Sequence, residues 1–236
     1  MSNLPLPKRV LAVGAHADDI EFGCGATLAK WAAGGAAIDL CVLTDGSKGS
    51  WDPETDVAAL IATRRQEQTA AAATLGARTV HFLDLIDGEL VNDLDAQGAL
   101  SDVLRHVRPD VVLGHDPWKR YRLHPDHRAA GFLTIDAIVA ARDPHFFPGR
   151  GEPHRPDRLL LFEADVIDHV EDVHDFIDAK IQALLRHETQ WRSTMGINPT
   201  SPDAEPFAKR IRGEAKEAAD GTEYDLGEAF KLIEPL

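Results

Sequence analysis

The feature that most constrains the fold of this 236-residue chain is a regular alternation of short apolar runs with helix-like stretches. Apolar runs of strand length occupy residues 9–13, 38–43, 79–85, 110–116 and 158–164. The helix-like stretches between and after them occupy residues 26–33, 57–75, 95–107, 125–141 and 173–187. Such alternation is typical of a sheet whose strands run parallel. We therefore predict a single α/β domain, a Rossmann-like and mostly parallel sheet with helices on both faces and a peripheral C-terminal segment.

The C-terminal segment differs from the rest of the chain in composition. From residue 197 the sequence becomes polar and contains proline. We expect residues 1–196 to form the core and residues 197–236 to form an extension packed on it, made of a flap, a helix and an edge strand. No internal repeat or low-complexity linker indicates a second core.

The formal net charge of −14 limits the classes of partner. Because there is no surplus of cations to neutralise phosphates, a nucleic acid or an anionic membrane is a disfavoured partner. No apolar run approaches the length of a membrane span, and the N-terminal "MSNLPLPKRV" lacks the apolar core of a signal peptide. We expect a cytoplasmic protein that acts on a small molecule, and the sequence leaves homo-oligomerisation open.

The two cysteines, Cys24 and Cys41, match no zinc or redox motif in their spacing. We expect both thiols to be buried and reduced. Any metal site must therefore be built from histidine, aspartate and glutamate.

Polar clusters follow three of the predicted strands. They read "HADD" at residues 16–19, "TDGSKGS" at residues 44–50 and "HDPWKRYRLHPDH" at residues 115–127. Ligands of open parallel sheets bind at the carboxyl ends of the strands. The topology should therefore bring these three distant segments together at one edge of the sheet.

Two of these clusters have the spacing of a metal site. His124 and His127 are three residues apart at a predicted helix start, where they share a face and where the helix dipole favours neutral imidazole. His16 and Asp19 are also three residues apart. Two histidines and one carboxylate, with a position left for water, are a typical catalytic zinc set.

Other interpretations of the same residues remain open at this stage. Asp18 has a residue type that commonly caps a helix N-terminus. His16, Asp18 and His127 could also form the two-histidine, one-carboxylate set of a non-haem iron oxygenase, although such sets usually occur in β-rich folds. A non-catalytic binding module is a third interpretation.

Four stretches together resemble a known family. The segments "AHADDIEFGCGATLA", "LTDGSKG", "RRQEQTAAAATLG" and "LHPDHRAAG" are similar to those of the zinc-dependent PIG-L/LmbE-like de-N-acetylases, which include the bacillithiol and mycothiol biosynthetic deacetylases. The resemblance covers roughly residues 8 to 190, in the same order. One departure is Ala17, where the family usually has a proline that would stiffen the loop.

The resemblance implies the roles of five residues. His16, Asp19 and His127 would hold one zinc ion per chain. Asp18 would be the general base, and His124 would polarise the substrate carbonyl or protonate the leaving amine. The implied reaction is removal of an acetyl group from an N-acetylated amino sugar or glycoconjugate, with amide cleavage in a thiol–sugar conjugate as an alternative.

Five further residues are candidates for substrate contact. Arg64 matches an arginine of the family's helix motif and would contact substrate hydroxyls. Asp45 could shape the rim of the site or make a turn, Asp116 could contact substrate or orient a ligand histidine, and Tyr121 could contact substrate. His187 matches a histidine that the family often carries, with a role in support or substrate contact. We interpret the remaining histidines as core or surface residues: His81, His106, His115, His145, His154, His169 and His174.

Overall fold

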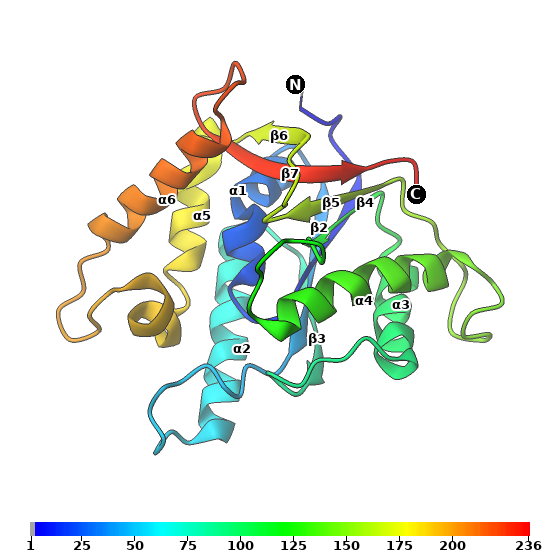
Figure 1. Cartoon of the computed structure of the whole chain (residues 1–236), viewed down its shortest axis with the longest axis horizontal. Coiled ribbons are helices and arrows are strands. Elements are labelled where there is room, and N and C mark those ends of the chain that lie inside the picture. The colour runs from blue at the N-terminus through cyan, green and yellow to red at the C-terminus, as the bar shows by residue number, and fades with distance from the viewer. Residues whose placement is uncertain (1–2) are drawn as a thin grey trace.

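The computed structural model describes residues 3–236 and contains one seven-stranded sheet (Figure 1). The strand order across the sheet is β3-β2-β1-β4-β5-β7-β6. The strands are β1 (Arg9–Gly14), β2 (Ala37–Thr44), β3 (Thr79–Leu85), β4 (Val111–His115), β5 (Arg158–Phe162), β6 (His169–Asp172) and β7 (Gly227–Ile233). The first five pair in parallel, and β7 pairs antiparallel with both of its neighbours. This arrangement confirms the predicted mostly parallel α/β fold.

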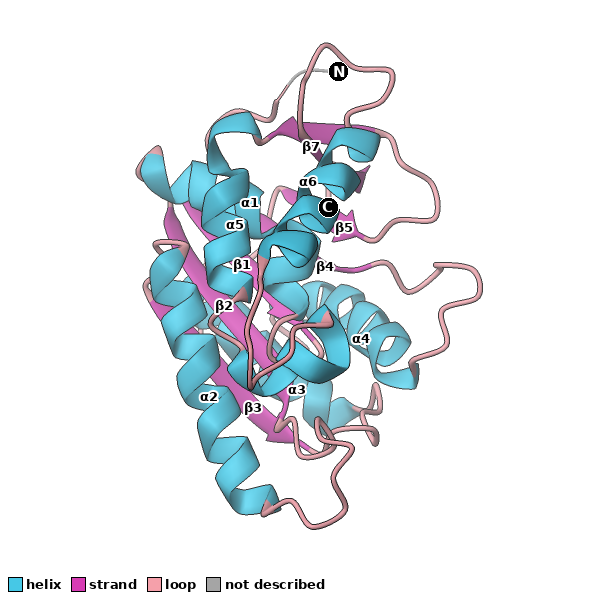
Figure 2. Ribbon diagram, turned by 90° about the vertical axis from the view of Figure 1, so that its left-hand side faces the viewer, coloured by secondary structure: helices cyan, strands magenta, loops and turns pink. Residues whose placement is uncertain are grey.

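Helices cover both faces of the sheet, as Figure 2 shows from the side. Their bounds are α1 (Asp19–Ala33), α2 (Val57–Thr74), α3 (Leu94–Val107), α4 (Pro125–Arg142), α5 (Ile177–Leu184) and α6 (Glu205–Ala218). Apolar residues of α1, α2 and α5 pack on one face, and those of α3 and α4 pack on the other. No helix within residues 3–236 is long and apolar enough to span a membrane.

The sheet is buried on both faces, which explains the uninterrupted apolar runs in the sequence. In β1 every residue after Arg9 is buried, and in β4 every residue is buried. Continuous apolar strands of this kind are typical of a parallel sheet whose two faces are both covered by helices. The carboxyl ends of β1 to β5 consequently emerge at one edge between two layers of helices.

The C-terminal region contributes more to the sheet than we expected. The strand predicted at an edge is β7, which lies inside the sheet between β5 and β6. The edge is formed by β6, a four-residue strand that the sequence patterns did not predict. α6 packs its apolar side on α5 in a third apolar cluster. The division of the chain into residues 1–196 and 197–236 stays a prediction.

α1 carries the start of the site and has an irregular beginning. It begins at Asp19 rather than at residue 26, and Cys24 interrupts it with φ −152° and ψ 18°. The regular part after this kink matches the predicted helix. Gly23 is required at the kink because a Cβ there would lie 2.5 Å from the ring of Phe162.

Candidate active site

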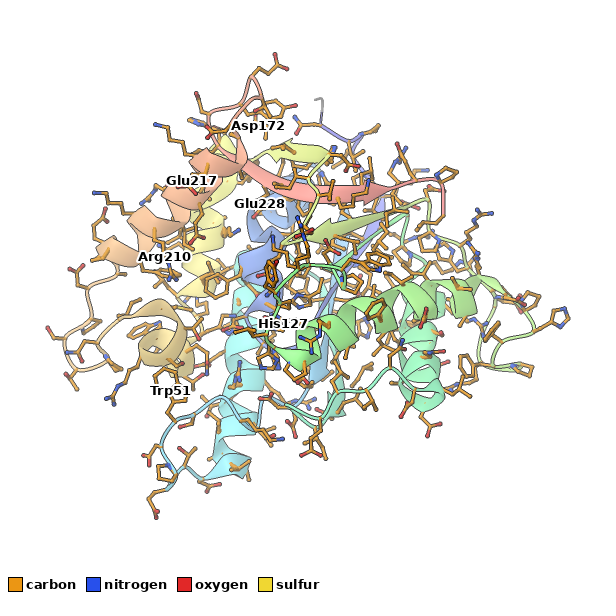
Figure 3. All side chains as sticks on the ribbon, viewed as in Figure 1. Trp51, His127, Asp172, Arg210, Glu217 and Glu228 are labelled. Atoms are coloured by element: carbon orange, nitrogen blue, oxygen red, sulfur yellow. The ribbon has the colours of Figure 1, made fainter. Side chains whose placement is uncertain are left out.

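A cleft of about 710 Å³ opens at the carboxyl edge of the sheet. One part of its wall consists of residues that follow β1, β3 and β5 and residues at the start of α4. The opposite part comes from the loop after β2, from the π-helical turn η3 (Trp191–Met195) and from α6. Figure 3 shows Arg210 on α6 and Trp51 on the loop before α2, both on the α6 side of His127. The predicted convergence of the three polar clusters is therefore present, and the C-terminal region adds a further wall.

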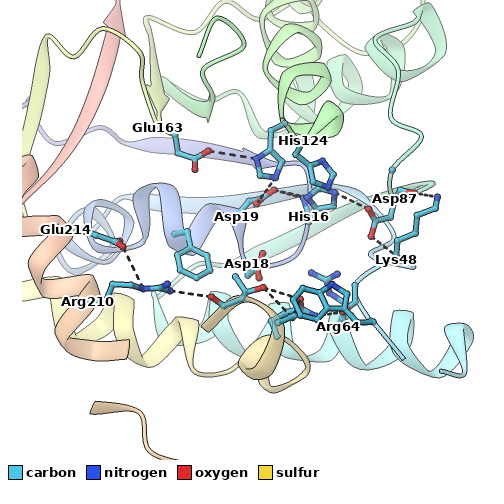
Figure 4. Close-up of a pocket in the computed structure, with 18 residues that line it drawn as sticks. His16, Asp18, Asp19, Lys48, Arg64, Asp87, His124, Glu163, Arg210 and Glu214 are labelled. Atoms are coloured by element: carbon cyan, nitrogen blue, oxygen red, sulfur yellow. Dashed lines mark hydrogen bonds and ion pairs between the residues drawn. The ribbon is translucent and has the colours of Figure 1, made fainter. Parts of the chain in front are cut away.

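His16, Asp19 and His127 converge on one point of this cleft. Figure 4 shows His16 beside Asp19 there. His16 Nδ1 lies 3.3 Å from Asp19 Oδ2, and His127 Nε2 lies 3.3 Å from Asp19 Oδ1. One ligand atom from each of the three residues lies within 4.8 Å of the others. Two imidazoles and a carboxylate at this separation fit a zinc ion with an open coordination position.

Further carboxylates surround His16, and they show that this position accommodates positive charge. His16 Nε2 lies 3.1 Å from Asp87 Oδ1 and 3.1 Å from Asp126 Oδ2. Burial alone would lower the pKa of His16, but these carboxylates and Asp19 raise it to about 12. A buried site with this excess of carboxylate has to hold a cation, either a proton or a metal ion.

Asp18 occupies the N-cap position of α1 but does not act as a cap. Its side chain makes no capping hydrogen bond, and its backbone is left-handed, with φ 97°. For a residue with a Cβ that conformation costs about 1–2 kcal/mol. Burial, followed by the neighbouring charge of Asp19, raises the pKa of Asp18 to about 7. Helix capping therefore does not explain why the chain places an aspartate here.

His124 caps α4 and lies against the metal-binding group. Its Nδ1 accepts the N–H of Asp126 at 3.3 Å, so in the neutral imidazole the proton is on Nε2. The ring of His124 meets that of His16 edge-on at 4.7 Å and stacks with that of His127 at 4.9 Å. Burial, followed by the positive charge of His16 and His127, lowers the pKa of His124. His124 is therefore a neutral hydrogen-bond donor facing the cleft.

Four site residues were missed by the sequence analysis. His115, which we interpreted as a core or surface residue, is buried beside the metal-binding group, with Nε2 3.2 Å from Asp19 Oδ2. Its Nδ1 lies 3.3 Å from Glu163 Oε2. Asp87 and Asp126 complete the set through their contacts with His16. Their positions in the sequence could have indicated two of the four, because His115 is the last residue of β4 and Glu163 directly follows β5.

Arg64 and His187 lie on two sides of Asp18. Arg64 is buried, lines the cleft and has an Nε with no hydrogen-bond partner among the described residues. His187 is fully buried, and its Nε2 lies 3.6 Å from Glu21 Oε2. Arg64 Nη1 and Nη2 donate to the Gly46 and Ala17 carbonyls at 3.2 and 2.8 Å, so a direct substrate contact by Arg64 stays a prediction. His187 supports the wall behind Asp18.

The other predicted contacts lie outside the cleft wall formed by residues 3–236. Asp45 makes a turn, where its Oδ1 accepts the N–H of Asp87 at 3.1 Å. Asp116 is buried in another turn, where its Oδ2 accepts the N–H of Asp165 at 2.8 Å. Tyr121 is 93% exposed. A substrate contact by any of these three stays a prediction.

Comparison with known families identifies the family of this chain. Residues 11–138 match the model of the PIG-L family, described as GlcNAc-PI de-N-acetylase, and this match includes His16, Asp19, His124 and His127. The chain belongs to the PIG-L family. This membership confirms the resemblance seen in the sequence and the prediction of an enzyme of the deacetylase class.

Individual members of the PIG-L family are similar over most of the chain. A diacetylchitobiose deacetylase of Thermococcus kodakarensis is 34% identical over 188 residues, covering 78% of this chain and 70% of the relative. The structure of the N,N'-diacetylchitobiose deacetylase of Pyrococcus horikoshii superposes with a TM-score of 0.86 at 27% identity, covering 97% of this chain and 84% of that one. A 4-oxalmesaconate hydratase of Pseudomonas putida is 31% identical over 199 residues, covering 78% and 76%. The family thus includes a hydratase beside its deacetylases.

Proposed function

We propose that this protein is a zinc-dependent hydrolase that removes the acetyl group from an N-acetylated amino sugar within a glycoconjugate. The observation that carries the proposal is the divergence of two adjacent carboxylates. Asp19 faces His16 and His127, whereas Asp18 enters the cleft beside Arg64. Asp19 can therefore bind the metal ion while Asp18 remains free to transfer a proton.

His16, Asp19 and His127 would hold the zinc ion. When bound there, zinc supplies a Lewis acid for the amide carbonyl and lowers the pKa of water. The iron set considered from the sequence, His16, Asp18 and His127, is not the group that converges, since the carboxylate beside the two histidines is Asp19. Oxygenase chemistry is disfavoured because the similar proteins are named as deacetylases.

Asp18 and His124 would perform the proton chemistry of amide hydrolysis. A carboxylate with a pKa of about 7 is well matched to take a proton from the attacking water at neutral pH and to return it to the leaving nitrogen. The Nε2–H of neutral His124 would donate to the carbonyl oxygen as negative charge develops on it. The tautomer of His124 thus favours the carbonyl-polarising role over the role of acid.

The volume of the cleft supports a substrate larger than one sugar. An N-acetylated sugar ring with about fifteen non-hydrogen atoms fills roughly 250–300 Å³ at protein packing density, less than half of the cleft of about 710 Å³. The remaining wall offers the polar side chains of Gln190, Ser193, Thr194 and Arg210. These groups suit the hydroxyls of a second ring attached to the acetylated sugar.

The charges in the cleft wall disfavour a polycarboxylate substrate such as the 4-oxalmesaconate named for the hydratase relative. Acidic residues outnumber basic ones in the wall, and the Lys48 and Arg210 side chains lie beside Glu89 and Glu214. Because Lys48 and Arg210 are already paired with carboxylates, few free cations remain in the wall to bind a polycarboxylate outside the zinc position.

The deciding experiment measures acetate release. Protein stripped of metal and reloaded with zinc should release acetate from N,N'-diacetylchitobiose or an N-acetylglucosaminyl-inositol with a higher kcat/KM than from free N-acetylglucosamine. Iron loading with oxygen-dependent turnover, or hydration of an unsaturated polycarboxylate without acetate release, would contradict the proposal. An N-acetylated thiol–sugar conjugate belongs in the same panel.

A further inference from the structure

Two side chains on one face of α2 form hydrogen bonds with the peptide group between Ala17 and Asp18, one with its carbonyl and one with its N–H. Arg64 Nη2 donates to the Ala17 carbonyl at 2.8 Å, and the Asp18 N–H donates to Gln68 Oε1 at 3.0 Å. Arg64 and Gln68 are four residues apart, so they project from the same helix face. Because both polar groups of a single peptide plane are bonded, the plane cannot turn without losing both hydrogen bonds.

The side-chain amide of Gln68 has only one orientation that suits its surroundings. Gln68 and Glu21 are fully buried, and Gln68 Nε2 donates to Glu21 Oε1 at 2.6 Å. A carboxylate accepts and a backbone N–H donates, so the amide nitrogen must face Glu21 and the amide oxygen must face Asp18. Glu21 therefore orients Gln68, and Gln68 orients the peptide.

The peptide held in this way has an unfavourable conformation. Asp18 has φ 97°, a region that residues with a Cβ rarely adopt, and its own side chain makes no hydrogen bond that would stabilise it. Such a conformation persists only where the surrounding structure holds it. The bonds from α2 are the contacts that do so at this peptide.

We propose that Gln68 is a positioning residue for the hydrolytic reaction. It holds the Ala17–Asp18 peptide in the left-handed conformation and thereby keeps the Asp18 carboxylate in the cleft. This inference rests on the proposed role of Asp18 as the base. Without the Gln68 bond the peptide can rotate to negative φ, which carries the carboxylate away from the attacking water. Within residues 3–236 the hydrogen bonds of Gln68 go to Asp18 and Glu21 and not to His16, Asp19 or His127, so these three residues should keep their arrangement.

The test uses two Gln68 variants and a matched control. Gln68→Met keeps the length of the side chain but removes both hydrogen bonds, and Gln68→Asn keeps the amide but withdraws it by one methylene. Ser101→Ala removes a buried hydrogen bond of 3.2 Å to the Ala137 carbonyl on the other face of the sheet. The readouts are kcat, KM, bound zinc, melting temperature and a crystal structure of each Gln68 variant.

Both Gln68 variants should lower kcat by about tenfold to hundredfold, because displacement of a catalytic group by about 1 Å has an effect of this size. KM should stay within about twofold, and zinc should stay at one ion per chain. The crystal structure of Gln68→Met should show Asp18 at negative φ. Ser101→Ala should lower the melting temperature but leave kcat unchanged.

Two results would overturn the proposal. One is a Gln68 variant whose Asp18 keeps positive φ and whose kcat stays within about twofold of the wild type. The other is a loss of kcat that only follows a loss of bound zinc. The conformation of Asp18 is measured without substrate, so a wild-type protein that releases no acetate would refute the proposed function and leave this structural test intact. If Gln68→Met does not fold, Gln68→Asn supplies the same comparison.

Discussion

At the scale of single residues, two adjacent carboxylates acquire different properties because their surroundings differ. Burial alone would raise the pKa of Asp19, but His127 and His115 lie against its carboxylate and hold the pKa well below the ordinary value. At Asp18, burial and the charge of Asp19 outweigh the opposing charges of Arg64 and His187 and raise the pKa to about 7. One residue is therefore suited to remain an anion in a metal site, and its neighbour is suited to exchange a proton.

This difference predicts separable effects of two substitutions. Asp18→Asn should lower kcat by about 10²- to 10⁴-fold, the usual contribution of a general base, and should leave zinc stoichiometry at one ion per chain. Asp19→Asn should instead lower the affinity for zinc, because it removes a ligand charge. Acetate release under saturating substrate and metal analysis after dialysis distinguish the two.

Asp93→Asn is a suitable control, since Asp93 caps α3 away from the cleft through the Ala96 N–H. It should not change kcat or metal content. An Asp18→Asn enzyme that kept wild-type kcat would remove Asp18 from the role of base.

The sequence predicted the four residues whose three-residue spacing is typical of metal ligands, and it missed residues without such a spacing partner. His16 with Asp19, and His124 with His127, are recognisable because the local spacing places each pair together. Asp126 lies between His124 and His127, but its contact with His16 comes from another segment and has no local pattern. Asp87 and Glu163 each come from a different loop with no partner nearby in the sequence, and only the packing of the loops brings them to the site. Their positions after β3 and β5 were visible, but nothing local separated them from ordinary turn residues.

At the scale of secondary-structure elements, the kink in α1 is stabilised by charges from two other elements. Glu228 on β7 accepts the N–H groups of Ala26 and Thr27 at 3.1 and 2.7 Å, at the start of the regular part of the helix. Lys180 on α5 donates to the Phe22 carbonyl before the kink and to Glu228, both at 2.7 Å. The buried pair thus satisfies backbone groups on both sides of the break.

Glu228→Gln should therefore destabilise the fold strongly. It leaves the buried Lys180 ammonium without its counter-charge, which costs about 3 kcal/mol or more. For a domain of this size that corresponds to a decrease of roughly 6–12 °C in melting temperature. Thermal unfolding followed by circular dichroism measures the change.

The matched comparison is Asp102→Asn, which breaks the exposed ion pair with Arg150. Exposed pairs contribute about 0–1 kcal/mol, so this variant should melt within a few degrees of the wild type. Equal shifts for the two variants would show that the buried pair does not stabilise the kink.

The same kink explains why the sequence predicted only part of α1. The segment Gly23–Gly25 has the composition of a helix breaker, so a helix starting near residue 26 is what local propensity favours. The turn before the kink depends on Glu228 and Lys180, which lie about 150 to 200 residues further along the chain. Local sequence contains no information about partners at that distance.

At the scale of the whole molecule, the two ends of the chain complete the sheet and fix α1. β7 pairs with β5 and β6, and the N-terminal segment runs beside β6, where the Leu4 N–H donates to Glu171 Oε1 at 2.7 Å. Glu171 also accepts from His169 Nε2 at 2.7 Å and pairs with Lys30 of α1. One fully buried carboxylate therefore joins the N-terminal segment, α1 and β6.

This carboxylate gives the stability of the fold a defined dependence on acid. Burial alone would raise the pKa of Glu171, but the hydrogen bond from His169 and the charge of Lys30 hold it below its ordinary value of 4.5. The unfolded chain then binds a proton at higher pH than the folded protein does. The stabilisation is consequently complete above about pH 4.5 and is lost as the pH falls through the lower folded pKa.

Glu171→Gln should decrease the free energy of unfolding at pH 7 by about 3 kcal/mol, because it breaks a buried charged cluster. The difference from the wild type should shrink as the pH falls below 4.5, because the unfolded chain binds a proton there while the folded carboxylate binds it only at lower pH. Urea denaturation across this range measures the difference at each pH. Asp225→Asn, at a residue whose side chain is 87% exposed, should show no such convergence. A difference between Glu171→Gln and the wild type that stayed constant down to pH 3 would mean that the Glu171 cluster makes no contribution to acid sensitivity.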